Sequence, residues 1–152
     1  MSTMSDVVVS DTSCLILLSK IEQLELLQDL FEKILITPEV AIEYSETLPE
    51  WIHISESNSK LIPELDHKLD SGEATSIRLA KEKRATLIFD ELKGRRIAQQ
   101  YNLKITGTLG ILIKAKQLNR ISTLKPLLDQ LKDQGFRISN RLYNRALQLV
   151  NE

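Results

Sequence analysis

The sequence predicts an α/β fold, with a single domain whose central parallel sheet is flanked by helices. Two observations lead to this prediction. Short apolar runs, such as the valines from Val7 to Val9 and "ATLIF" before Asp90, are typical of strands that are covered on both faces. Between them lie longer segments with apolar residues at helical spacing, and parallel strands need such crossover connections. A chain of 152 residues is most simply one domain.

The expected elements alternate along the chain. Residues 1–5 are expected to form a disordered tail before a domain that spans 6–152. Strands are expected at "VVV", "KILI", residues 51–54, "ATLIF" and "LKIT". Helices are expected over 13–31 (as one or two), after Thr37 as N-cap, over "SGEATSIRLAKEKR" with its cap near Ser71 or Gly72, over "ELKGRRIAQQYN" and "GTLGILIKAKQLN", and over 122–135 and 139–150.

Composition narrows the classes of function. Lysine and arginine number 20 against 21 for aspartate and glutamate, so the net charge of −1 gives no global basic field for nucleic acid, and any such contact must be local. Cys14 is the single cysteine, which excludes an internal disulfide framework and favours a packing role. Asp11 interrupts the first apolar run well short of the roughly 20 residues that span a membrane. We therefore expect a soluble, cytoplasmic protein with no membrane contact.

Four carboxylates are candidate site residues. Asp11 and Asp90 each follow a predicted strand, and open parallel sheets bind ligands at the carboxyl ends of their strands. Glu73 lies on the same helix side as the apolar Ile77, and Glu43 belongs to the helix after Thr37. Each also has a structural interpretation, because aspartates cap helices, a first-turn glutamate interacts with the helix dipole, and most helical glutamates are solvated.

Together these carboxylates predict a metal site. Carboxylates that gather at the edge of an apolar core raise one another's proton affinity unless a cation neutralises them. Their hard oxygen atoms suit Mg²⁺ or Mn²⁺, which can activate water and stabilise charge on a phosphodiester during in-line displacement. His53 and His67 lack the spacing of a zinc site and Cys14 stands alone, so zinc is excluded.

The ordered set resembles the acidic quartet of PIN-domain nucleases. The matching residues are Asp11 in "DTS", Glu43 in "PEVAIEY", Glu73 in "SGEATSIRLA" and Asp90 in "LIFDE". A prokaryotic PIN-like branch is similar also in "LPEW", "DELKGRRIA" and "GTLGILIKAK", and the resemblance runs from Asp6 to Ser139. Glu73 stands where many PIN nucleases have aspartate, and its longer side chain would shift the metal position.

The resemblance implies an acidic cluster at the C-terminal edge of a parallel sheet, Mg²⁺- or Mn²⁺-dependent hydrolysis of RNA, and frequent homodimers. Many relatives resemble VapC-type toxins, which a small DNA-binding antitoxin protein holds inactive. By position, the metal-binding and catalytic carboxylates would be Asp11, Glu43, Glu73 and Asp90. Ser13 matches the hydroxyl beside the family's site, and Glu91 would assist the carboxylates.

A basic cluster lies beside the predicted site. Lys93, Arg95 and Arg96 are candidate RNA-binding residues because arginine forks bind phosphate well. The alternative is a solvated helix face or ion pairs with Glu82 or Glu91. The "GTLG" stretch lacks the lysine and spacing of a P-loop, and we expect its glycines to serve close helix–sheet packing.

Other functions stay open. Haloacid-dehalogenase-type phosphatases need a second aspartate where Ser13 stands, and receiver domains need an acidic pair from a strand before Asp11. The stronger alternative is a PIN-fold module that binds nucleic acid or protein with little or no catalysis. A third alternative is a subunit whose C-terminal helices pack on another protein through a stripe of leucines. Such an apolar stripe is more typical of a core. The stripe consists of Leu124, Leu127, Leu128 and Leu131.

Overall fold

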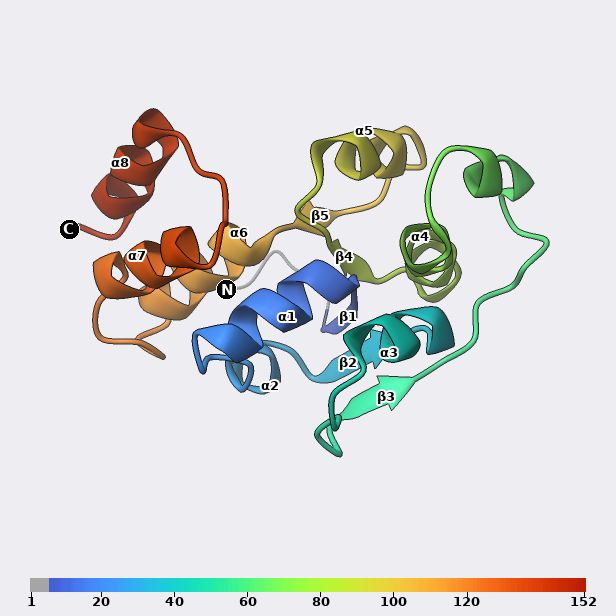
Figure 1. Cartoon of the computed structure of the whole chain (residues 1–152), viewed down its shortest axis with the longest axis horizontal. Coiled ribbons are helices and arrows are strands. Elements are labelled where there is room, and N and C mark those ends of the chain that lie inside the picture. The colour runs from blue at the N-terminus through green and yellow to red at the C-terminus, as the bar shows by residue number, and fades with distance from the viewer. Residues whose placement is uncertain (1–5) are drawn as a thin grey trace.

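The computed structural model describes residues 6–152, so the tail expected at 1–5 lies outside the described residues. Its centre is a five-stranded sheet in the order β3-β2-β1-β4-β5, with every neighbouring pair parallel (Figure 1). The strands are β1 (Val7–Ser10), β2 (Lys33–Ile36), β3 (Ile52–Ile54), β4 (Thr86–Ile88) and β5 (Ile105–Thr106). The predicted α/β class with a central parallel sheet is confirmed.

Helices connect the strands and continue beyond the last one. They are α1 (Thr12–Lys20), α2 (Leu26–Leu30), α3 (Pro38–Tyr44), α4 (Ser71–Lys83), α5 (Leu92–Gln100), α6 (Thr108–Gln117), α7 (Lys125–Asp133) and α8 (Asn140–Leu149), with a 3-10 helix η1 (Pro63–His67). The segment 13–31 forms two helices because the chain turns at Glu22, whose φ of 59° ends α1. Helix α4 is capped by Asp70, one residue before the expected position.

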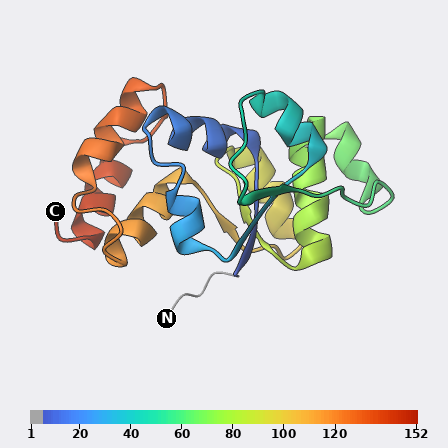
Figure 2. The ribbon, with the colours of Figure 1, turned by 90° about the horizontal axis from the view of Figure 1, so that it is seen from below.

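The sheet is covered on both faces, which explains the continuous apolarity of its strands. Along β1, Val8 packs into a core with α1, α2, α3 and α6, whereas Val9 packs into a second core with α4 and α5. Figures 1 and 2 show these two helical layers with the strands between them. Cys14 is fully buried in the first core, and burial raises the pKa of its thiol, as expected for a packing residue.

The strand order places the candidate aspartates side by side. The connection after β1 leads to β2 on one side of β1, whereas β4 lies on the other side, so the order reverses between β1 and β4. Ser10 pairs with Ile88 at the end of these strands, and the Asp11 N–H donates to the Ile88 carbonyl at 3.0 Å. Ligands of open parallel sheets bind at such a reversal. Asp11 and Asp90 leave the sheet at this point.

The segment before α4 is held by one buried arginine. The Arg78 side chain is 3% exposed, and its Nε and Nη2 donate to the Leu61 and Ile62 carbonyls at 2.6 and 3.1 Å. Its Nη1 donates to Asp66 Oδ1 at 3.0 Å. These bonds attach the loop and η1 to the helix that carries Glu73.

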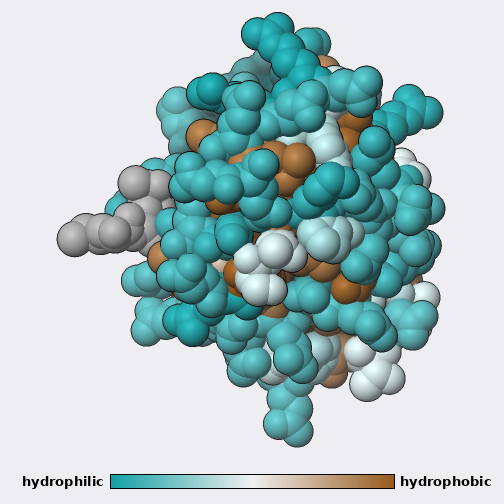
Figure 3. Space-filling model, turned by 90° about the vertical axis from the view of Figure 1, so that its left-hand side faces the viewer, coloured by the Kyte–Doolittle hydropathy of each residue, from teal (hydrophilic) through white to brown (hydrophobic). Residues whose placement is uncertain are grey.

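The C-terminal helices form one end of the molecule, beside α6 and far from β3 (Figures 1 and 2). The leucine stripe of residues 124–131 is buried in the first core, so it is not a free interface. Figure 3 shows this end covered mainly by hydrophilic residues, with apolar ones scattered between them. None of the helices within residues 6–152 combines the length and the apolarity that crossing a membrane requires.

Candidate functional site

Asp11 is the most deeply placed candidate carboxylate. It follows β1 at the N-cap position of α1 and is 7% exposed, yet its side chain makes no capping hydrogen bond. The pKa of Asp11 is raised to about 6, mainly by burial and also by the charges of Asp70, Glu43 and Asp90, against a lowering by the Thr12 N–H. The capping interpretation therefore does not account for this aspartate.

Asp90 is positioned by the start of α6. Its Oδ1 accepts from the Thr108 N–H at 2.7 Å and its Oδ2 from the Thr108 hydroxyl at 2.6 Å. Gly107 allows this approach, because a Cβ there would lie 2.5 Å from Asp90 Oδ1. The first glycine of "GTLG" thus makes room for the carboxylate, while Gly110 lies against the Thr106 side chain and serves the expected helix–sheet packing.

Glu43 reaches the site from α3 across the start of α4. A Cβ at Gly72 would collide with Glu43 Oε1, so the glycine provides the space for this carboxylate. The Thr12 hydroxyl donates to Glu43 Oε2 at 3.4 Å. Glu43 is exposed overall, but partial desolvation of its carboxylate and the charge of Asp70 raise its pKa. These contacts direct the Glu43 side chain toward Asp11.

Glu73 is engaged in a capping box. The Asp70 N–H donates to Glu73 Oε1 at 3.2 Å, and the Glu73 N–H donates to Asp70 Oδ1 at 2.9 Å. Desolvation raises the pKa of Glu73 to about 7, with contributions from the Asp70 and Asp11 charges. The capping alternative is therefore present at Glu73, and Asp70 adds a fifth carboxylate that the sequence analysis missed.

The five carboxylates Asp11, Glu43, Asp70, Glu73 and Asp90 offer the oxygen ligands of a divalent-cation site, but they are not arranged to coordinate one ion together. None of the five carboxylates forms a salt bridge with a described residue, although three have raised pKa values. Within residues 6–152, no three His, Cys, Asp or Glu side chains are arranged closely enough to hold a metal as they stand. Glu73 is turned toward its cap and Asp90 toward Thr108. Hard oxygen ligands suit Mg²⁺ or Mn²⁺, and Glu73 would have to leave its capping bond to join the other carboxylates at a metal.

The other predicted site residues lie at the same edge. Ser13 is exposed on α1, two residues after Asp11. Glu91 is the N-cap of α5, where its two oxygens accept from the Lys93 and Gly94 N–H groups at 3.0 Å each. Glu91 therefore caps α5 in the structure, and its role in assisting the four carboxylates stays a prediction.

The basic cluster begins α5. Lys93 and Arg96 are exposed and Arg95 is half-buried. Neither arginine forms an ion pair with Glu82 or Glu91, since Glu82 accepts from the Asn58 N–H and Glu91 caps the helix. Both remain available to an anionic ligand.

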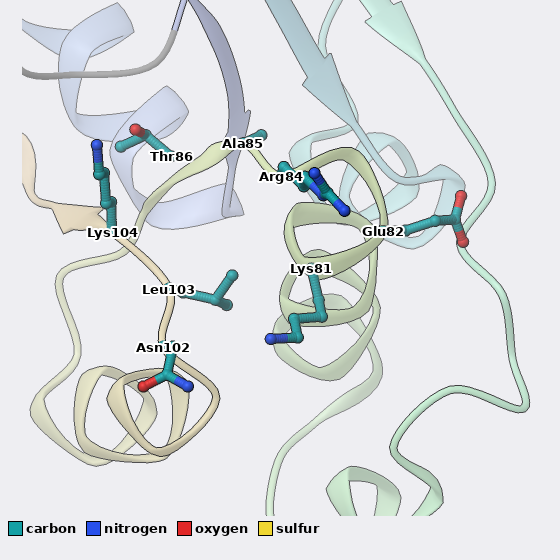
Figure 4. Close-up of a pocket in the computed structure, with 8 residues that line it drawn as sticks. All are labelled: Lys81, Glu82, Arg84, Ala85, Thr86, Asn102, Leu103 and Lys104. Atoms are coloured by element: carbon teal, nitrogen blue, oxygen red, sulfur yellow. The ribbon is translucent and has the colours of Figure 1, made fainter.

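A cavity of about 710 Å³ lies at the opposite edge of the sheet, where the strands begin. Figure 4 shows its lining, with Lys81 at the end of α4, Lys104 before β5, and Glu82 pointing away from both. The Lys81 ammonium donates to the Tyr101 carbonyl at 2.9 Å, so this cation satisfies the end of α5. None of the nine predicted site residues lines this cavity.

The five-stranded parallel sheet flanked by helices is the architecture expected of a single PIN-like domain. A family model described as "DUF3368: PIN domain" matches residues 7–152, and the chain belongs to that family. PIN domains are in general metal-dependent nucleases, and they act on nucleic acid. Comparison with curated proteins and with solved structures gives no match.

Two positioning residues were not found from the sequence. Asp70 stands three residues before Glu73, which is the spacing of a capping box and was a readable signal. Thr108 had no such signal, because its bonds to Asp90 join residues 18 positions apart.

Proposed function

We propose that this protein is a metal-dependent endoribonuclease whose metal ligands are Asp11, Glu43, Glu73 and Asp90. The observation that carries the proposal is the burial of Asp11 among like charges, with no capping bond and no basic partner among the described residues. Bound there, Mg²⁺ or Mn²⁺ would supply an activated water and stabilise the charge that develops on an RNA phosphodiester.

The protein's own groups have separate tasks in this proposal. Thr108 fixes the direction of Asp90, and Thr12 and Gly72 fix that of Glu43. Ser13 offers a hydroxyl at the rim, and the basic cluster of residues 93–96 would hold RNA phosphates. Glu73 would leave its capping bond to reach the metal, and Asp70 would retain its own bond to the Glu73 N–H.

A second candidate function is a PIN-fold binding module with little or no catalysis. It is favoured by one observation: Glu73 and Asp90 already have protein donors, and no three ligands converge within residues 6–152. Such a module would bind nucleic acid or protein without turnover.

The resemblance to VapC-type toxins supports three further proposals. The protein would be a toxin-like component that a small antitoxin protein inhibits, it would act as a homodimer, and it would be cytoplasmic. The exposed side chains of α8, which include Leu142 and Leu149 at 47% and 49% exposure, are available for association.

The test is calorimetric titration of Mn²⁺ at neutral pH with the native protein, Asp11→Asn and Asp90→Asn. Both variants keep the side-chain size and remove the charge. Asp133→Asn, at the exposed end of α7, is the matched control. We expect native protein and the control to bind Mn²⁺ and to cleave labelled RNA, and the two site variants to lose at least a hundredfold of cleavage.

The outcomes separate the candidates. If the native protein binds no Mn²⁺, or if the site variants bind it equally well, the proposed metal site is rejected and the binding module is the function that stands. Mn²⁺ binding lost in both variants, but without RNA cleavage by the native protein, would keep the metal site and remove the nuclease.

A further inference from the structure

An apolar groove runs along α1 beside Asp90. Its first wall is one face of α1, formed by Ser13, Ile16, Leu17 and Lys20 at positions i, i+3, i+4 and i+7. Two helical turns, about 10 Å, separate Ser13 at the acidic end from Lys20 at the far end. The groove has a volume of about 430 Å³, which is within the range of small-ligand sites.

The second wall is the turn between α7 and α8, and a helix-ending motif fixes its shape. Gly135 has a φ of 88°, the Gly135 N–H donates to the Lys132 carbonyl, and the Phe136 N–H donates to the Leu131 carbonyl, each at 3.0 Å. This is the Schellman arrangement, in which glycine supplies the left-handed residue. Phe136 is therefore held in place at the groove before any ligand arrives.

The groove combines an aromatic ring with two cations, Lys20 and Arg137. Phe31 and Phe89 are buried, whereas Phe136 is half-buried and lines the groove. Lys20 and Arg137 are exposed, and neither has a salt-bridge partner among the described residues. An apolar, aromatic seat with adjacent cations suits a base and its flanking phosphate in a single strand.

A second hollow on the other side of α1 fits RNA less well. It has a volume of about 520 Å³ and is lined by Glu43 and Glu46, with Lys20 as its cation. Its aromatic residue, Tyr44, is 6% exposed and bonded to the Ser19 hydroxyl at 2.6 Å. The groove beside Asp90 is also lined by two carboxylates, Asp90 and Glu91, but it has two cations, and both oxygens of Glu91 already accept from backbone N–H groups. Charge complementarity therefore favours this groove over the second hollow.

We propose that this groove seats one unpaired base of a single-stranded RNA substrate next to the scissile phosphodiester. Phe136 contacts the base, Ile16 and Leu17 form the apolar part of the first wall, and Arg137 with Lys20 binds the neighbouring phosphate. The proposal rests on the ribonuclease function proposed above and adds to that site a subsite for one base of the strand.

The test is the binding of a labelled octaribonucleotide in Ca²⁺, with a gel to confirm that the RNA stays intact. A series of the same RNA carries one abasic nucleotide at each position in turn. For native protein we expect one position at which the abasic nucleotide weakens binding about tenfold, the size of one base–aromatic contact. Phe136→Leu keeps an apolar side chain and is expected to bind normal RNA about tenfold more weakly, with no further loss at that position.

The phosphate contact is tested by Arg137→Gln against Arg84→Gln, an exposed arginine at the opposite edge of the sheet. Loss of one phosphate contact should lower the slope of log affinity against log salt by about 0.7 for a single strand. We expect that change for Arg137→Gln, and no change for Arg84→Gln. Circular dichroism and thermal unfolding establish that each variant is folded.

Each outcome decides the proposal. Base-dependent binding that Phe136→Leu abolishes supports the groove even if Mn²⁺ produces no cleavage, in which case the ribonuclease function fails alone. A flat abasic series, duplex RNA bound as tightly as single strand, or no RNA binding at all overturns the groove, even where cleavage or Mn²⁺ binding persists. The flat series is also the result if the groove holds an apolar protein segment. If Phe136→Leu does not fold, the proposal is decided by the abasic series with native protein and by the salt slope of Arg137→Gln.

Discussion

The two edges of the sheet carry opposite charge, and among residues 6–152 a buried carboxylate without an ion-pair partner, Asp11, lies at the carboxyl edge. Helices begin at the carboxyl edge, where Asp11, Asp70 and Asp90 gather, and α4 and α5 end at the amino edge, where Lys81 and Lys104 line the larger cavity. Both distributions match the helix dipoles, which favour acids at N-termini and bases at C-termini. Charge alone therefore identifies no site, and neither does cavity volume.

The difference lies in how each charge is satisfied. At the amino edge, Lys81 is exposed and donates to a helix-end carbonyl. At the carboxyl edge, Asp11 is buried, makes no capping bond and has a raised pKa. Perturbed carboxylates of this kind cluster at functional sites. Four predictions test this contrast between the two edges.

The largest expected effect is on stability. The folded-state pKa of Asp11 is about 6 against an ordinary value of 3.8, so between these values the folded state binds more protons and the free energy of unfolding falls as pH rises. That shift of about two units corresponds to at most about 3 kcal/mol above pH 6. In EDTA at pH 8, Asp11→Asn should therefore be more stable than native by up to that amount, measured by urea unfolding.

The control for this prediction is Asp133→Asn, which should follow the native pH dependence. Equal stability of Asp11→Asn and native protein from pH 4 to pH 8 would show that Asp11 carries no burial cost, and the contrast between the two edges would disappear.

The next effect concerns the space that Gly72 leaves for Glu43. Gly72→Ala places a methyl group against the Glu43 carboxylate and should weaken Mn²⁺ binding about tenfold, or about 1.4 kcal/mol. Alanine is the better helix former by up to about 1 kcal/mol, so unfolding should show no comparable loss. Ser71→Ala, at the adjacent exposed position, is the control. Unchanged Mn²⁺ affinity in Gly72→Ala would remove Glu43 from the site.

A smaller effect is expected from Thr108→Val. The variant removes the hydroxyl donor to Asp90 Oδ2 and keeps the N–H donor to Oδ1, so we expect about 1 kcal/mol of lost stability, measured by urea unfolding. Calorimetry should show weaker Mn²⁺ binding in the same variant. Thr86→Val, at the amino edge, should leave Mn²⁺ affinity unchanged. A Thr108→Val protein with native affinity would mean that Asp90 needs no orienting hydroxyl.

The smallest effect is expected at the amino edge itself. Arg84→Gln and Lys104→Gln are exposed changes and should alter stability by less than about 0.5 kcal/mol. They should also leave Mn²⁺ binding and RNA cleavage within twofold of native. A loss of cleavage with intact Mn²⁺ binding would extend the RNA-binding surface around to the cavity of Figure 4.

The sequence predicted the parts of this molecule that depend on short-range pattern. Apolar runs identified the strands, and Asp11 and Asp90 were expected at a shared edge because each follows one. That β1 and β4 are neighbours could not be read from the sequence, since strand order depends on where the crossovers pack. The close approach of Glu43 to Gly72 was equally hidden, because it joins two helices through a missing Cβ.

The two kinds of carboxylate differ in conformational entropy before any ligand binds. Asp11 and Asp90 follow strands that the sheet holds in register, and Asp90 is already oriented by Thr108. Glu43 and Glu73 extend from helices on longer side chains, and immobilising such a side chain costs up to about 2 kcal/mol of rotamer entropy. In the proposed metal site, the aspartates would therefore determine where the cation binds, and the glutamates would determine how tightly it binds. A variant that restricts the glutamate rotamers would raise affinity without moving the site.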